Sequence, residues 1–138
     1  MKKLAITEIL SALFLAGIIL TSGCESKRSL SQGFLQGTIS IGPICPVESI
    51  PPDPACQPTA ETYKAYPVSV YTPDEKNKIT QLNPSLDGSF KSELPPGRYL
   101  IVLEKKSGNI GGSNLPVEVT ITSNDNTFLS INIDTGIR

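Results

Sequence analysis

From Phe34 onward, this sequence is a succession of short segments in which apolar and polar residues alternate. The clearest examples are Leu35-x-Gly37-x-Ile39-x-Ile41, Tyr66-x-Val68-x-Val70, Val117-x-Val119-x-Ile121 and Leu129-x-Ile131-x-Ile133. A period of two places every second side chain on one face of a β-strand, and clusters of Gly, Pro, Asn and Asp separate the segments. The pattern predicts an all-β sandwich that begins at Phe34, with no helix in this part of the chain.

Three further segments complete a predicted set of seven strands. Residues 78–82 and 89–92 alternate more weakly, whereas residues 99–103 are apolar at nearly every position. A strand with apolar residues on both faces is covered on both sides or lies centrally in its sheet, so we expect a central position for residues 99–103.

Turn residues predict how these strands connect. Asp87-Gly88 favours a tight hairpin turn, and Pro96-Gly97 suits the two central positions of a type II turn. The last two strands are expected to form a hairpin around Ser123-Asn-Asp-Asn126. Asp87 is interpreted as a turn residue that bonds its own backbone, not as a metal ligand.

The first residues have the layout of a secretory signal peptide. Two lysines precede an apolar stretch from Ile9 to Leu20, which is short for a membrane span, and small residues follow at Thr21-Ser-Gly-Cys24. The ending resembles a bacterial lipobox, which implies that Cys24 carries lipid and is the first residue of the mature protein. A plain signal peptide, or a membrane anchor that stays attached, is the alternative.

This interpretation divides the chain into a signal peptide at 1–23, a flexible tether at 24–33 and a sandwich domain at 34–138. It also places the domain at the cell envelope, on the extracytoplasmic side of a bacterial membrane. The expected partners are that membrane, through Cys24, and an unidentified envelope protein or polysaccharide.

Two cysteines remain, Cys45 and Cys56, in a proline-rich loop at residues 43–60. Cysteines pair in oxidising compartments, so a Cys45–Cys56 disulfide is predicted. A zinc site would need more ligands than two sulfurs, and the spacing does not suit a redox pair. Two unpaired thiols are the remaining alternative.

The composition excludes several kinds of chemistry. The chain has 12 Lys+Arg against 13 Asp+Glu, so it lacks the basic surface that nucleic acid requires. It has no histidine, which removes the commonest general base and metal ligand and makes a Ser-His-Asp triad impossible. We therefore expect no catalytic residue, no metal and no cofactor.

Several motifs resemble those of prealbumin-like domains, which include carboxypeptidase regulatory-like domains and collagen-adhesin B-type repeats. The resemblance covers residues 34–105 and rests mainly on Asp87-Gly-Ser-Phe90 followed by Leu94-Pro-Pro-Gly-Arg-Tyr99, with support from Gly37 and Pro67-Val-Ser-Val70. It implies a seven-stranded Greek-key sandwich but almost nothing about function. The fold-motif residues are Asp87, Gly88, Phe90, Pro95, Pro96, Gly97 and Tyr99, and Tyr99 is expected in the core.

The sequence thus favours a lipid-anchored, non-catalytic module for binding or structural support. Recognition is expected at residues 48–59 and at the loop 105–113, although the proline-rich loop could equally serve only to cover an open end of the sandwich. The alternative function is a secreted enzyme or enzyme inhibitor with its site in the loops. An enzyme of that kind would need carboxylates such as Glu48, Asp53 and Glu61 to converge in a cleft.

Overall fold

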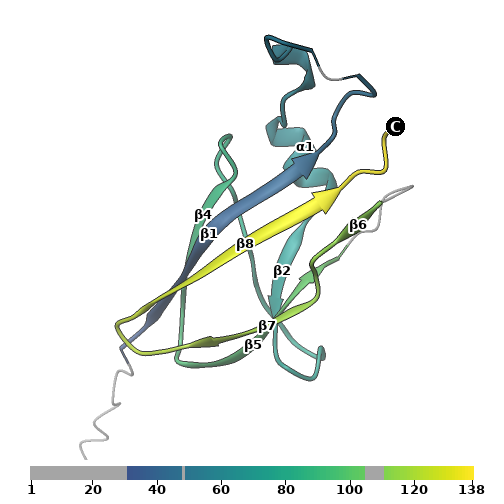
Figure 1. Ribbon diagram of the computed structural model, residues 1–138. Helices are drawn as coiled ribbons and strands as arrows, with labels where there is room; N and C mark the ends of the chain where they lie inside the picture. Colours follow the sequence, from purple (N-terminus) through teal and green to yellow (C-terminus); the bar gives the residue numbers. More distant parts are fainter. Residues whose placement is uncertain (1–30, 48, 105–110) are drawn as a thin grey trace, which may run out of the picture.

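The computed structural model describes residues 31–47, 49–104 and 111–138, and their strands form two packed four-stranded sheets (Figure 1). The predicted all-β sandwich is confirmed. The first sheet has the order β4-β1-β8-β6 and the second the order β3-β2-β5-β7. The strands of the first sheet are β4 (Ser89–Leu94), β1 (Gly33–Gly42), β8 (Asn126–Asp134) and β6 (Gly112–Ser113). Those of the second are β3 (Lys78–Gln81), β2 (Val68–Tyr71), β5 (Gly97–Leu103) and β7 (Val117–Ile121).

One hydrophobic core fills the space between the sheets, and it uses the inward positions of the alternating segments. The strand β5 lies between β2 and β7, as its two apolar faces predict. Tyr99 is buried in the core, as expected. The buried apolar residues are Leu35, Ile39, Ile41, Val68, Val70, Leu82, Phe90, Leu94, Tyr99, Ile101, Leu103, Val119, Ile121, Ile131 and Ile133.

The last strand pairs with the first, and the expected hairpin between the last two strands is wrong. β8 runs parallel to β1 from the pair Phe34 and Asn126 to the pair Gly42 and Asp134, whereas β7 lies in the other sheet beside β5. Alternation shows that a strand has an inward face, but it does not say in which sheet the strand lies. The chain between β7 and β8 therefore turns from one sheet to the other.

Two other predicted turns also connect the sheets. A turn does form at Asp87-Gly88, with the Gly88 N–H donating to the Ser85 carbonyl and Gly88 at φ +83°, but β3 and β4 lie in different sheets and do not form a hairpin. The type II turn at Pro96-Gly97 is wrong, because Gly97 has an extended φ of 159°.

The expected absence of helices in the domain is also wrong. A 3₁₀ helix η1 spans Pro54–Cys56, and an α-helix α1 spans Ala60–Ala65. Thr59 begins α1 with a reciprocal cap, in which its side chain accepts from the Thr62 N–H while the Thr62 hydroxyl accepts from the Thr59 N–H. The described residues also contain eight strands where seven were predicted, because β6 forms at the end of the 105–113 loop.

The connections fall at two opposite ends of the sandwich. β1 begins at the end where the Asn124 N–H donates to the Gln32 carbonyl and the Ser123 hydroxyl donates to the Ser31 carbonyl. It finishes at the opposite end, which carries the proline-rich loop, α1 and the turn at Asp87 (Figure 1). We call the second end the stapled pole and the first the base. None of the helices in the described ranges is long and apolar enough to cross a membrane.

Candidate functional site

The stapled pole is built around the predicted disulfide, which the structure confirms between Cys45 and Cys56 with a Cα–Cα distance of 5.4 Å. We call residues 43–59 the stapled loop; residue 48 lies outside the described ranges. Proline cannot donate a backbone hydrogen bond, so a loop with this many prolines has few backbone ties of its own. The cross-link therefore supplies much of the restraint on this loop.

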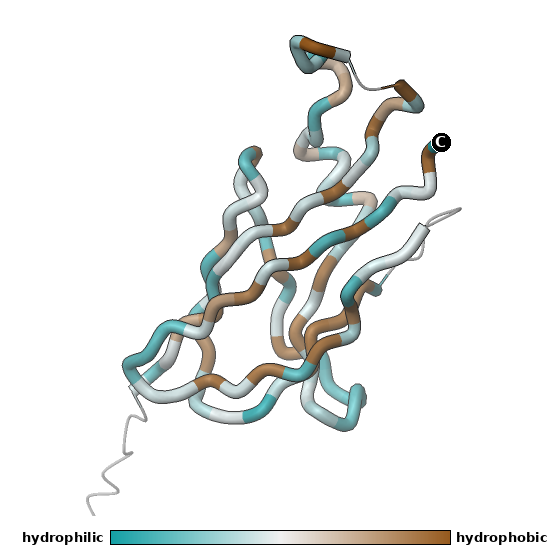
Figure 2. The backbone as a smooth tube through the Cα atoms, viewed as in Figure 1, coloured by the Kyte–Doolittle hydropathy of each residue, from teal (hydrophilic) through white to brown (hydrophobic). Residues whose placement is uncertain are grey.

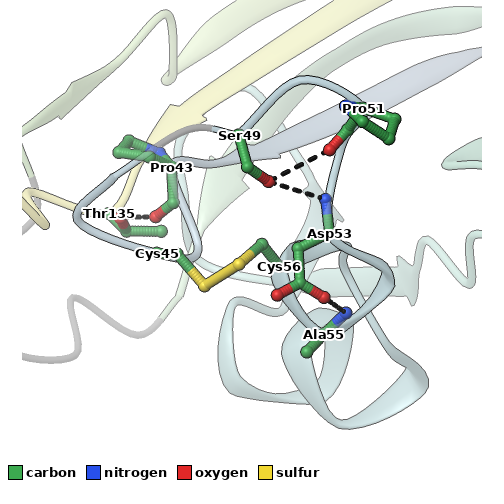
Figure 3. The surroundings of a disulfide bond; sticks show 8 residues. All are labelled: Pro43, Cys45, Ser49, Pro51, Asp53, Ala55, Cys56 and Thr135. Carbon is green, nitrogen blue, oxygen red and sulfur yellow. Dashed lines mark hydrogen bonds between the residues drawn. A yellow bond between two sulfur atoms is a disulfide. The ribbon is translucent and has the colours of Figure 1, made fainter.

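Side chains within the loop supply further restraint (Figure 3). The Ser49 hydroxyl donates to the Pro51 carbonyl and accepts from the Asp53 N–H, both at 3.1 Å. The Asp53 side chain accepts from the Ala55 N–H at 2.8 Å and so caps the helix η1. These contacts fix the second half of the loop just before Cys56.

The end of β8 holds the start of the loop. The Thr135 N–H donates to the Gly42 carbonyl at 3.0 Å, and its hydroxyl donates to the Pro43 carbonyl at 2.5 Å (Figure 3). Thr135 and Ser69 are the buried polar residues within the described part of the chain. The end of β1, where the loop begins, is therefore hydrogen-bonded to the residue that follows β8.

A pocket of about 530 Å³ lies at the stapled pole. The end of β1, the stapled loop, Tyr63 of α1 and the turn at Leu86 and Asp87 line it. Its wall includes the disulfide itself. A concave surface of this size, lined by both polar and apolar groups, is a candidate binding site.

Large aliphatic side chains stand exposed on the stapled loop and at Leu86. Ile50 is 100% exposed, Val47 77% and Leu86 71%, and Val47 and Leu86 line the pocket. Figure 2 shows hydrophobic segments at the tip of the loop, away from the core. Single exposed apolar residues are ordinary, but a group of them beside a pocket is typical of an interaction surface.

The polar groups of the pocket are acidic or neutral. Its described lining includes Asp53 and Asp87 and no lysine or arginine. Hydrogen bonds from the Ser89 hydroxyl and N–H, at 2.6 and 2.9 Å, lower the pKa of Asp87, which is therefore ionised at neutral pH. Burial, and to a lesser extent the Asp87 charge, raise the pKa of Tyr63, so its phenol stays protonated.

The sequence candidates separate between the two ends of the sandwich. Asp87 and Gly88 lie at the stapled pole, while Pro95, Pro96 and Gly97 connect β4 to β5 at the base, where the Tyr99 hydroxyl donates to the Pro95 carbonyl at 2.8 Å. Phe90 is in the core. Cys24 lies outside the described residues.

The carboxylates that an enzyme would need are not brought together as a set. Asp53 shares the pocket with Asp87, but Glu61 does not line it and pairs with Lys64 on α1 at 2.8 Å. Glu48 lies outside the described residues. Among the residues described, no group of three or more His, Cys, Asp and Glu side chains could hold a metal ion.

A second polar cluster lies on the outer face of the sheet that contains β2. Glu104 accepts from the Tyr71 hydroxyl at 2.9 Å and pairs with Lys78 at 2.8 Å. The Lys78 hydrogen bond is the main reason that the pKa of Glu104 is lowered. Ser69 is fully buried nearby, and its hydroxyl makes no hydrogen bond of normal geometry with the described residues. A carboxylate already held by a lysine and a phenol is a poor general base, so this cluster offers no catalytic group.

Sequence reasoning found the loop and Asp87 but not the pocket between them. The signal was present in the aliphatic residues Val47 and Ile50 of a proline-rich loop and in Leu86 beside Asp87. Only the fold shows that the turn at Leu86 and the loop lie at the same end of the sandwich. The 105–113 loop cannot be assigned to this site, because residues 105–110 lie outside the described ranges.

No protein-family model matches the sequence, and no curated protein matches it. Solved structures are similar over 75% of the chain. A DUF3823 family protein from Parabacteroides merdae is 16% identical, with a TM-score of 0.46 over 46% of that protein. GBS52, the minor pilin of Streptococcus agalactiae, is 13% identical, with a TM-score of 0.49 over 44% of its chain. The TIE protein of Bacillus anthracis is 12% identical, with a TM-score of 0.47 over 16% of its chain.

This chain therefore spans less than half the length of each of these three proteins. With TM-scores below 0.5 and identities of 16% or lower, these similarities support no conclusion about ancestry or activity. The assignment of the fold rests on the strands, the sheet order and the core of the chain itself.

Proposed function

We propose that this protein is a lipid-anchored, non-catalytic module of a bacterial cell envelope, and that it binds a partner through the stapled pole. The observation that carries the proposal is the pocket beneath the stapled loop, with exposed aliphatic side chains at its rim. The pocket lies at the opposite end of β1 from the residues that follow the predicted anchor.

The direction of β1 determines which end of the domain would face the membrane. The strand has ten residues, so its ends lie about 30 Å apart at roughly 3.3 Å per residue. The predicted lipid is attached at Cys24, only nine residues before Gly33 begins the strand. A domain anchored in this way holds its base toward the membrane and presents the stapled pole outward, where a partner can reach it.

A non-catalytic role agrees with the groups available. The chain has no histidine, Glu104 is held by Lys78, and the two pocket aspartates each bind local backbone. The prolines and the disulfide restrain the loop before it meets a partner, which lowers the conformational entropy lost on binding.

Anchoring and recognition are tested separately. Replacing Cys24 with Ser should release the protein from the membrane fraction and remove the mobility change that lipid causes on a gel. A protein that still sediments with membranes would show that its N-terminal segment is retained as a helix.

For recognition, a photo-crosslinking amino acid is placed at Ile50 in intact cells, with Phe128 as the control position. Both side chains are strongly exposed, at 100% and 75%, but Phe128 lies on β8, away from the stapled pole. We expect a defined crosslinked species from position 50 alone. The same pattern from both positions, or none from position 50, would count against a binding site at the stapled pole.

A separate variant tests whether the loop only covers the end of the sandwich. A Gly/Ser segment in place of residues 46–55 keeps both cysteines and removes Val47, Ile50 and Asp53. The photo-crosslinking amino acid is kept at position 50 within this segment. If the crosslinked partner is lost while the melting temperature is unchanged, the loop recognises the partner. A large fall in melting temperature would show that the loop mainly covers the end of the sandwich.

A further inference from the structure

The charged side chains that line the pocket are of one sign. Two basic side chains lie at the same end of the sandwich, but Lys64 is paired with Glu61 and Arg138 with Asp134. Of the charged residues described at the pocket, both are aspartates, Asp53 from the loop and Asp87 from the turn before β4. A ligand that binds here therefore meets negative charge inside an apolar rim.

Each pocket aspartate uses one oxygen to hold the backbone. Oδ1 of Asp53 accepts from the Ala55 N–H, and Oδ1 of Asp87 accepts from the Ser89 N–H and hydroxyl. For neither residue does Oδ2 have a hydrogen-bond partner among the described residues. Both carboxylates are thus fixed in position by their turns, with acceptor capacity left for a ligand.

The apolar part of the pocket complements this charge. Val47, Leu86 and the prolines offer a surface for aliphatic groups, and Tyr63 is the one aromatic side chain among the described residues that line it. Lysine and arginine have an apolar stem and a charged head, so one such side chain can contact both parts of the pocket. A sugar ligand, by contrast, is usually bound on broad aromatic surfaces.

We infer that the stapled pole recognises a segment of a partner protein in which a lysine or arginine is flanked by aliphatic side chains. The basic head binds at Asp53 and Asp87, and the aliphatic side chains pack on Val47, Ile50 and Leu86. This inference rests on the proposed function, since it names the partner chemistry of the same site.

Random dodecapeptides displayed on phage, selected on the immobilised full chain, provide the probe. We expect the enriched peptides to carry a basic residue next to aliphatic ones. The double variant Asp53→Asn/Asp87→Asn should bind synthetic copies of these peptides at least about tenfold more weakly, as expected for lost charge-assisted hydrogen bonds. Asparagine keeps the Oδ1 acceptors that hold both turns, so the fold should be preserved, and an unchanged melting temperature verifies this.

Asp125→Asn is the matched control. It removes one carboxylate charge just before β8, at the base, where the Asp125 side chain accepts from the Asn126 N–H. Binding should be unchanged. A second measurement needs no variant: raising the salt concentration from about 50 to 500 mM should weaken binding to the natural chain, because salt screens exposed charge pairs.

Other outcomes overturn the inference. Selection of uncharged or acidic peptides, no enrichment, or equal binding by the double variant would each reject a basic partner segment. A homodimer that Ile50→Ser dissociates in sedimentation equilibrium would identify a second copy of the chain as the occupant. If basic peptides bind the Gly/Ser loop variant as well as the natural chain, the proposed binding site itself is wrong.

Discussion

Gly37 and Leu129 lie backbone to backbone where β1 and β8 pair, and a β-carbon on Gly37 would overlap the carbonyl group of Leu129. The parallel pairing of the first and last strands thus depends on a residue without a side chain. Gly37 is only half-buried. The close approach of the Leu129 backbone, and not burial in the core, is therefore the reason that this position requires a glycine.

Replacing Gly37 with Ala should destabilise the domain by about 1–3 kcal/mol, because the added methyl group forces the two backbones apart. Gly42→Ala is the matched control on the same strand, since a β-carbon there would meet no atom within 4 Å. Denaturant unfolding of both variants gives the two free energies. Equal effects would contradict the close approach of β1 and β8.

Removing the disulfide should lower the free energy of unfolding by about 3 kcal/mol, as the chain-entropy model gives for a closed loop of this length. Cys45 and Cys56 are 11 positions apart in the sequence. The double variant Cys45→Ala/Cys56→Ala is compared with the natural chain by denaturant unfolding, with and without reductant. Reductant should destabilise only the natural chain; no response to reductant in either protein would mean that the bond contributes no stability.

Tyr99→Phe should cost about 1 kcal/mol, because it leaves the Pro95 carbonyl without the partly buried hydroxyl that bonds it at 2.8 Å. Tyr71→Phe is the control, since the Tyr71 hydroxyl bonds Glu104 at an exposed position where water can replace it. Its effect should stay within about 0.5 kcal/mol. Similar losses in both variants would show that the Pro95 contact has no special role.

The carboxylate of Asp134 should support the fold down to strongly acidic pH. Hydrogen bonds from Arg138, which have the largest effect, and from the Gly136 N–H lower the pKa of Asp134 from 3.8 to about 2. Because the folded pKa is the lower one, this stabilisation is present above about pH 4 and is lost as the pH falls through 2. In Asp134→Asn, the denaturation midpoint should vary less between these two pH values than in the natural chain. An identical acid profile would contradict the prediction.

The sequence predicted the location of most strands, because alternation reports directly which residues face a core. Leu35, Ile39 and Ile41 are buried on β1, and Ile131 and Ile133 are buried on β8, as expected. The partner of each strand could not be predicted in the same way. The Asp87-Gly88 turn and the residues between β7 and β8 have hairpin chemistry, but each leads the chain from one sheet to the other.

The helix α1 was missed because Thr59 and Thr62 form its cap without the acidic or amide residue that usually marks a capping box. The disulfide could be predicted, because the number of cysteines and the expected compartment left one pairing. The pocket could not, since it forms only when Leu86 meets a loop that lies some 30 to 40 residues earlier in the chain.

The parallel pairing of β1 and β8 also determines how the domain responds to mechanical force. A tension applied between the base, where the chain enters β1, and the far end of β8 would act along both strands. The hydrogen bonds between the two strands lie across that direction, so the force loads all of them together in shear. A hairpin pulled at its open end, by contrast, loses its hydrogen bonds one at a time. Such a load is carried by β1 and β8, the longest pair of strands in the described ranges.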